Sequence, residues 1–133
     1  HHVATKIRPA LERGEVVLTD RYLDSSVAYQ GVGRALRAQD VRDISMFAVE
    51  GLLPDLTILL DLEASAAAER RSNTGEAPDR LEQEKIEFFE AVRQAYLDMA
   101  AAEPNRWLVI DARESVDEMQ AKIRNRVAEL LGA

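Results

Sequence analysis

Asp20 and Arg21 stand together directly after a short run of apolar or β-branched residues, Val16 to Thr19. Such a run predicts a buried strand of a parallel sheet. In open α/β sheets, ligands bind beyond the carboxyl ends of the strands, which is where this pair would lie. Arginine binds phosphate oxygens in a bidentate fork, and a carboxylate faces Mg²⁺, usually through water. The pair therefore predicts phosphate and magnesium chemistry, and the simpler alternative is a capped strand end with a surface ion pair.

The elements that must position this pair alternate between predicted helices and predicted strands. We expect strands over residues 16–19, 56–62 and 107–111, and helices over 5–13, 36–53, 64–71, 81–102 and from Ser115 onward. Pro9 predicts a kink or a first turn, and Gly14 predicts a helix stop. Ser115 with Glu118 three residues later is a capping-box pattern. The alternation predicts an α/β fold in which helices flank a parallel sheet.

Apolar residues at helical spacing define the faces that we expect to be buried. The face of the helix over 36–53 consists of Ile44, Phe47, Ala48 and Leu52. The face of the helix over 81–102 consists of Ile86, Phe89, Val92, Tyr96 and Met99. The last helix has the stripe Met119, Ile123, Val127 and Leu130.

The composition excludes several classes of protein. The chain has 133 residues, 47% of them hydrophobic, a net charge of −7 and no cysteine. A nucleic-acid-binding or anionic-membrane-binding surface would be basic, so neither partner is expected, and any anion site must be a local concentration of positive charge. The lack of cysteine excludes disulfides, thiolate catalysis and cysteine-based zinc sites, and it fits a reducing cytoplasm. No apolar run is long enough to span a membrane.

A series of short motifs follows the Asp-Arg pair in order along the chain. They are Asp20-Arg21-Tyr22, Ser25-Ser26, Ala28-Tyr29-Gln30-Gly31 with Arg34, Pro54-Asp55-Leu56-Thr57, Leu59-Leu60-Asp61, Asp79-Arg80-Leu81-Glu82 and Ile110-Asp111-Ala112. Together they resemble the bacterial thymidylate kinases over essentially the whole chain. This resemblance implies a P-loop NTPase-like nucleoside monophosphate kinase. It also implies ATP-dependent phosphorylation of dTMP to dTDP in dTTP biosynthesis, Mg²⁺, a homodimer and a cytoplasmic location.

The resemblance further implies a catalytic role for the first pair. Arg21 would clamp the acceptor phosphate or the moving phosphoryl group, where a fixed guanidinium stabilises the transition state. Asp20 would orient the waters of Mg²⁺. The alternatives are an ion pair of Arg21 with Asp20 or Asp24, and a capping role for Asp20.

The same resemblance assigns the residues that follow to the nucleoside. Ser25 and Ser26 would line the base side of the pocket, although either could instead be a helix N-cap. Tyr29 would occupy the space of a ribose 2′-hydroxyl and so favour deoxyribose, or it would be a core aromatic residue. Gln30 would reach the nucleoside, and Arg34 would meet either phosphate or solvent.

The lid loop that the resemblance implies covers residues 72–80. Residues 72–79 include no Lys or Arg. The basic residues at its borders, Arg70, Arg71 and Arg80, are therefore the candidates for contact with ATP. For Arg80 the alternative is an exposed ion pair at the start of a helix.

A P-loop is not visible in the sequence. None of the six glycines lies in the pattern Gly-x-x-x-x-Gly-Lys-Ser/Thr that holds the donor phosphates. We therefore expect residues 1–133 to be a single partial domain, the C-terminal part of a thymidylate kinase incomplete at the N-terminus and inactive alone. One alternative is a non-catalytic P-loop-like interaction module. The other is a related deoxynucleoside kinase, against which the segment from Ala28 to Gly31 argues.

Overall fold

The structure of the chain is a computed structural model that describes residues 2–33, 38–48, 51–72 and 80–132. It divides into two compact units, His1–Pro54 and Asp55–Ala133, and each unit is described by itself. Within the described residues, no helix has the length and apolar character required to cross a membrane.

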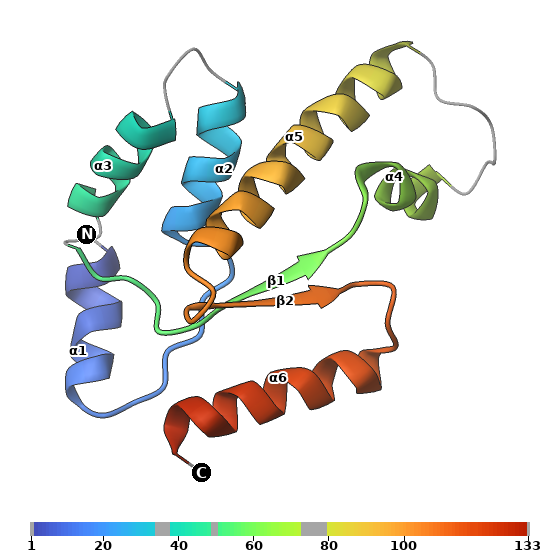
Figure 1. The fold of residues 1–133 in the computed structure, drawn as a ribbon. Coiled ribbons are helices and arrows are strands. Elements are labelled where there is room, and N and C mark those ends of the chain that lie inside the picture. Colours follow the sequence, from blue (N-terminus) through green and yellow to red (C-terminus); the bar gives the residue numbers. More distant parts are fainter. Residues whose placement is uncertain (1, 34–37, 49–50, 73–79, 133) are drawn as a thin grey trace. The chain divides into compact units, whose positions relative to one another are not determined.

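The first unit begins with a helix of mixed geometry. A π-helical turn, η1 (Val3–Ile7), continues into α1 (Arg8–Glu12) (Figure 1). Pro9 lies in the first turn of α1, directly after the π-helical turn, and its ring nitrogen has no N–H to extend the hydrogen bonding of that turn. Of the two predictions for Pro9, the first turn is therefore confirmed. Gly14 has φ +80°, a conformation that glycine adopts readily, and it follows the end of the helix as predicted.

The strand predicted over residues 16–19 is wrong for this structure. Residues 15–19 have no regular secondary structure, and Val16 and Leu18 are 72% and 92% exposed. A strand exists only when a neighbour accepts and donates its backbone hydrogen bonds. Among the described residues no strand pairs with this segment, so its apolar pattern has nothing to pack against.

Two further helices complete the first unit. α2 (Leu23–Gly33) and α3 (Ala38–Ala48) pack against each other. α3 is shorter than the helix predicted over 36–53, and positions 36, 37, 49 and 50 lie outside the described residues, as do the side chains of Ile44 and Ala48. The prediction that Phe47 is buried is wrong, because its side chain is 89% exposed. Helical spacing identifies a face, but only the packing partner decides how much of that face is covered.

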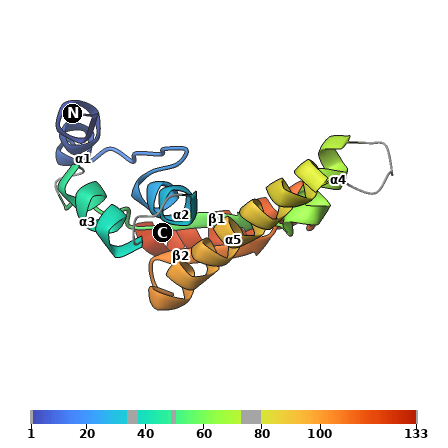
Figure 2. The ribbon, with the colours of Figure 1, turned by 90° about the horizontal axis from the view of Figure 1, so that it is seen from above.

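The second unit contains the parallel sheet that the sequence predicts. β1 (Thr57–Asp61) and β2 (Trp107–Asp111) run in the same direction, with Thr57 opposite Trp107 and Asp61 opposite Asp111 (Figure 1). The chain crosses between the strands through α4 (Ala64–Ser72) and α5 (Arg80–Ala102). α4 lies beside α5 in both views (Figure 1 and Figure 2). The α/β class with helices flanking a parallel sheet is therefore confirmed.

The core of the second unit lies where the helices meet β2. Val92 and Ala100 of α5 are buried, as are Trp107 and Ile110 of β2. α6 (Val116–Leu131) also contacts β2, but the stripe predicted on it is only half-buried at Met119, Ile123 and Val127 and is exposed at Leu130. The Ser115 hydroxyl accepts the backbone N–H of Glu118 at 3.1 Å, which confirms the predicted N-cap.

Candidate active site

The turn at Arg21 has an unusual backbone. Arg21 has φ +62°, in the left-handed region, which costs a residue with a side chain about 1–2 kcal/mol. The Thr19 hydroxyl donates to the Arg21 carbonyl at 3.3 Å, so a side chain from the preceding segment supports this conformation. A non-glycine residue in such a conformation persists where its surroundings hold it, and such residues are frequent at functional sites.

The residues that follow Arg21 anchor the turn. The Tyr22 hydroxyl donates to the carbonyl of Leu52 at 3.0 Å, and Leu23 is only 2% exposed. The backbone N–H of Ser25 donates to the Tyr22 carbonyl at 3.2 Å. Burial raises the pKa of Tyr22, and the nearby positive charge of Arg8 opposes that shift. Arg21 therefore lies in a turn whose following residues are fixed.

The structure brings two of the predicted site residues together. The guanidinium carbon of Arg21 lies over the ring of Tyr29, 5.0 Å from the ring centroid. Nη2 of Arg21 is 3.5 Å from the Tyr29 hydroxyl oxygen, to which it donates. Tyr29 comes from the second turn of α2 and is half-buried, whereas Arg21 is exposed.

The remaining predicted residues of the first unit are near the same turn or outside the described residues. Asp20 is exposed beside Arg21. Ser25 and Ser26 lie in the first turn of α2, which begins at Leu23, so neither is its N-cap residue. The side chain of Gln30 and all of Arg34 lie outside the described residues. Asp24, which entered the prediction only as an alternative ion-pair partner, is 4% exposed.

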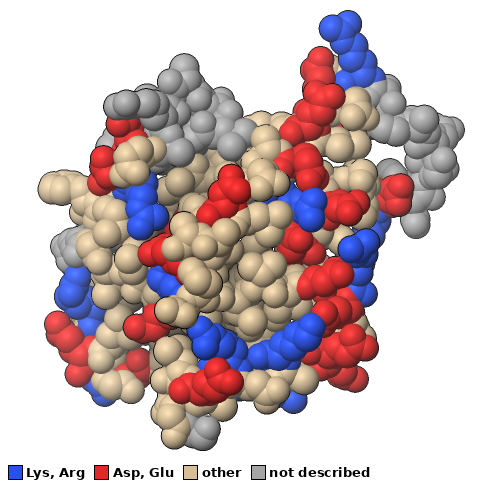
Figure 3. Space-filling model, viewed as in Figure 1, with Lys and Arg blue, Asp and Glu red and all other residues tan. Residues whose placement is uncertain are grey.

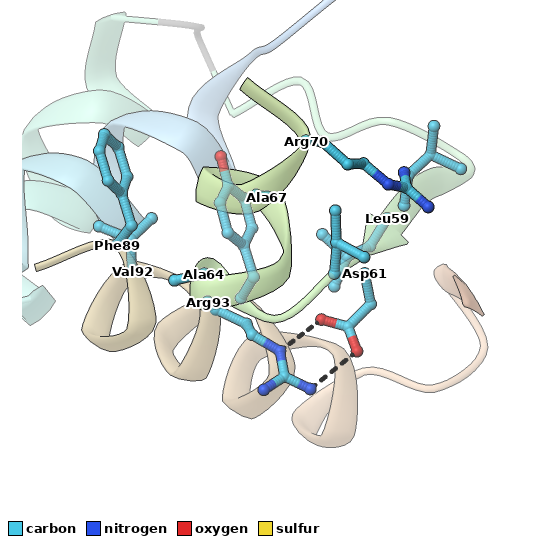
Figure 4. Close-up of a pocket in the computed structure, with 11 residues that line it drawn as sticks. Leu59, Asp61, Ala64, Ala67, Arg70, Phe89, Val92 and Arg93 are labelled. Carbon is cyan, nitrogen blue, oxygen red and sulfur yellow. Dashed lines mark hydrogen bonds and ion pairs between the residues drawn. The ribbon is translucent and has the colours of Figure 1, made fainter. Parts of the chain in front are cut away.

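The second unit has a cavity of about 450 Å³ beside the carboxyl end of β1. Its walls come from β1, α4 and α5, with Leu59, Ala67, Phe89 and Val92 among the apolar lining residues (Figure 4). Three charged side chains complete the lining: Asp61, Arg70 and Arg93.

An ionic network at this cavity joins three elements. Nε and Nη2 of Arg93 donate to the two carboxylate oxygens of Asp61 at 2.8 and 3.2 Å, as the dashed lines in Figure 4 show. Nη1 of Arg93 donates to Glu90 at 2.7 Å, and the other oxygen of Glu90 accepts the backbone N–H of Ala64 at 3.1 Å. The network therefore ties the end of β1 to the middle of α5 and to the start of α4. Neither Glu90 nor Arg93 was among the predicted site residues, although both lie within the predicted helix that follows the loop.

These contacts shift the pKa values of the groups involved. The hydrogen bonds from Arg93 to Asp61, and then to Glu90, raise the pKa of the guanidinium. The backbone N–H of Ala64, and then Arg93, lower the pKa of Glu90. At the end of the neighbouring strand, the backbone N–H and side chain of Arg113 lower the pKa of Asp111. Both strand ends thus carry carboxylates with a cationic partner.

The predicted lid arginines differ in their surroundings. Nη2 of Arg70 donates to the carbonyl of Ala112 at 3.5 Å, which places the guanidinium over the carboxyl end of the sheet. Nε of Arg80 lies 3.6 Å from Glu84, and the Arg80 side chain is 93% exposed, which matches the alternative of an ion pair at the start of a helix. The side chain of Arg71 and residues 73–79 lie outside the described residues. Contact of these arginines with ATP stays a prediction.

The exposed charged side chains are of both signs. On the face shown in Figure 3, acidic and basic side chains are interspersed. Among the residues that the structure describes, no three acidic or histidine side chains form a group that could hold a metal ion. The carboxylate of Asp20 is exposed, and its contact with Mg²⁺ through water stays a prediction.

The fold and the Arg21 turn define an α/β protein with a candidate phosphate site. A sequence model of the family described as "Thymidylate kinase" matches residues 1–123. The chain is 56% identical over its whole length to a thymidylate kinase of Clavibacter michiganensis, and 61% identical over 96% of its length to one of Leifsonia xyli. It is 51% identical over 92% of its length to a thymidylate kinase of Deinococcus radiodurans. The chain therefore belongs to the thymidylate kinase family.

The match covers only part of each relative. The alignment spans 63% of the Clavibacter protein, 60% of the Leifsonia protein and 59% of the Deinococcus protein. The chain thus spans about three fifths of the length of these curated relatives.

Replacing Arg21 tests whether its backbone is strained. We expect Arg21→Gly to be more stable than Arg21→Ala by about 1 kcal/mol, because alanine keeps the Cβ that disfavours φ +62° and glycine does not. Urea unfolding at pH 7 measures the difference. Arg13, which has φ −79°, is the control, because there the glycine variant should be the less stable of the two. An Arg21→Gly variant less stable than Arg21→Ala would contradict the strain.

The Glu90 contacts predict a pH dependence of stability. Because folding lowers the pKa of Glu90, its stabilising contribution is present above the unfolded value of about 4.3 and is lost as the pH falls through the folded value. Glu90→Gln should therefore be less stable than the unchanged chain at pH 7, and the difference should shrink below about pH 4. Urea unfolding of both proteins across this range measures it. The control is Glu84→Gln, on the exposed side of the same helix. If the stability difference between Glu90→Gln and the unchanged chain did not depend on pH, the lowered pKa of Glu90 would be refuted.

Proposed function

We propose that the protein phosphorylates dTMP to dTDP with ATP as the phosphoryl donor, in dTTP biosynthesis. The observation that carries this proposal is the family match, which extends over residues 1–123 and includes the Asp20-Arg21 turn. The match supports this function over a deoxynucleoside kinase and over a non-catalytic interaction module. The chain spans 60% to 63% of two of its relatives, so the proposal concerns a protein of the relatives' length.

Arg21 and Asp20 carry the chemistry in this proposal. An oxygen of the dTMP phosphate attacks the γ-phosphorus of ATP in line, the bond to the β-phosphate oxygen breaks, and ADP leaves without a covalent enzyme intermediate. The guanidinium of Arg21 binds the acceptor phosphate and the moving group, and its charge offsets the negative charge of both. Asp20 would hold Mg²⁺ through water, and the ion would supply further charge neutralisation at the phosphates. The exposure of both side chains supports their access to a ligand.

The nucleoside and the donor are assigned to different residues. Ser25, Ser26 and Gln30 contact the base and sugar, and Tyr29 disfavours a ribose 2′-hydroxyl. Arg70, Arg71 and Arg80 meet the ATP phosphates. The position of Arg70 over the carboxyl end of the sheet supports its part, because ligands of parallel α/β proteins bind at that end.

The same proposal includes a cytoplasmic homodimer without nucleic-acid or membrane partners. The resemblance to the thymidylate kinases suggests the homodimer, and the net charge of −7 disfavours binding to polyanionic surfaces. Sedimentation of the full-length protein at micromolar concentration should give a dimer, and a monomer there would contradict this part. Recovery of the protein from the membrane fraction of cells would contradict the cytoplasmic location.

Arg21→Lys in the full-length protein tests the catalytic assignment. Lysine keeps the charge but loses the planar fork, so we expect kcat to fall about a hundredfold or more, with a smaller change in KM for dTMP. Melting curves should barely change, because an exposed arginine contributes little to stability.

Steady-state conversion of dTMP and ATP to dTDP, with and without Mg²⁺, measures the effect. A near-normal kcat in the lysine variant would exclude the catalytic role. If the unchanged full-length protein makes no dTDP, the proposed function itself fails.

A further inference from the structure

The contact between Arg21 and Tyr29 joins two residues to which the proposed function gives separate tasks. The guanidinium lies over the ring at 5.0 Å from its centroid, and Nη2 also reaches the phenolic oxygen at 3.5 Å. The two residues are eight positions apart, one in the turn and one in α2. Their contact is therefore a tertiary contact between two elements of the first unit.

The geometry of a guanidinium lets it stack and bind phosphate at the same time. Its flat face interacts with the negative face of an aromatic ring, and its five N–H donors point outward in the plane. The Tyr29 hydroxyl accepts from one nitrogen, Nη2. A guanidinium has five N–H donors, so Nε and Nη1 of Arg21 can bind a phosphate oxygen pair.

Of Arg21 and Tyr29, Tyr29 is the residue whose position is fixed by packing. Tyr29 is half-buried on α2, and Val27 and Ala28 beside it are 7% and 0% exposed. Arg21 is an exposed side chain, and such a side chain loses rotamer entropy when it is held in one position. If the side chain is already held in place before substrate binds, this entropy loss does not add to the activation free energy.

We propose that Tyr29 is a positioning residue for Arg21, whose ring holds the guanidinium plane so that its remaining donors face the substrate phosphate. This inference rests on the proposed function. It differs from a steric gate, because a gate depends on the size of the ring, whereas positioning depends on the attraction between the ring and a cation.

Fluorination of the ring separates the two roles. In the full-length protein, Tyr29 is replaced by Phe and then by phenylalanines carrying one, two and three ring fluorines, which weaken the negative face of the ring with little change in its size. We expect kcat for dTMP to fall stepwise, about two- to fivefold over the series, with KM changing less. The preference for dTMP over its ribonucleotide analogue should stay constant. A flat kcat across the series would overturn the positioning role.

The same series in an Arg21→Met background is the matched control. Without the cation, fluorination should no longer change the residual kcat, because the ring acts only through Arg21. A stepwise fall that persists in this background would overturn the inference by showing that the ring acts directly on substrate. Failure of the proposed function is distinguishable, since the unchanged full-length protein would then form no dTDP, whereas a flat series in an active enzyme refutes only the role of Tyr29.

Discussion

The ion pair between Asp61 and Arg93 is the contact on which the second unit depends. A two-stranded sheet is marginal by itself and needs helices held against it. The fork from Arg93 attaches α5 to the last residue of β1, and Glu90 extends the attachment to the first backbone N–H of α4. The Asp61 and Arg93 side chains are only 19% and 27% exposed, so loss of either one would leave the other partly buried without its partner.

The two units use arginine in contrasting ways. The fork of Arg93 is occupied by a protein carboxylate, and a third nitrogen is bound to Glu90. Arg21 instead has its guanidinium carbon over an aromatic ring, and one of its nitrogens, Nη2, donates to the hydroxyl of that ring. Arg93 thus holds elements of the fold together, whereas Arg21 is the guanidinium that we propose binds a substrate phosphate. A guanidinium has donors in its plane and a face that can contact an aromatic ring. The neighbouring group determines which of these two contacts the arginine makes.

The sequence predicted the parts of the fold that depend on local pattern. Short stretches of sequence were enough to predict four features. They are the apolar runs of β1 and β2, the apolar periodicity of α5 and the N-cap at Ser115. The strand over 16–19 and the burial of Phe47 failed because each depends on a distant neighbour. Within the site, the contact between Arg21 and Tyr29 was not predicted. Arg93, the partner of the Asp61 carboxylate, lies 32 positions further along the chain, so no local sequence pattern indicates this pair.

The register of the sheet has a consequence for the electric field at its carboxyl edge. Pairing of Asp61 with Asp111 brings two strand-end carboxylates side by side, which alone would repel an anion. Arg93 forms an ion pair with Asp61 and Arg113 forms one with Asp111, and Arg70 donates to the carbonyl of Ala112 at the same edge. An ion pair acts at a distance as a dipole, whose field fades faster than that of a single charge. Each strand-end carboxylate is thus matched by a cation, which reduces the repulsion that the two carboxylates would exert on an anion at this edge.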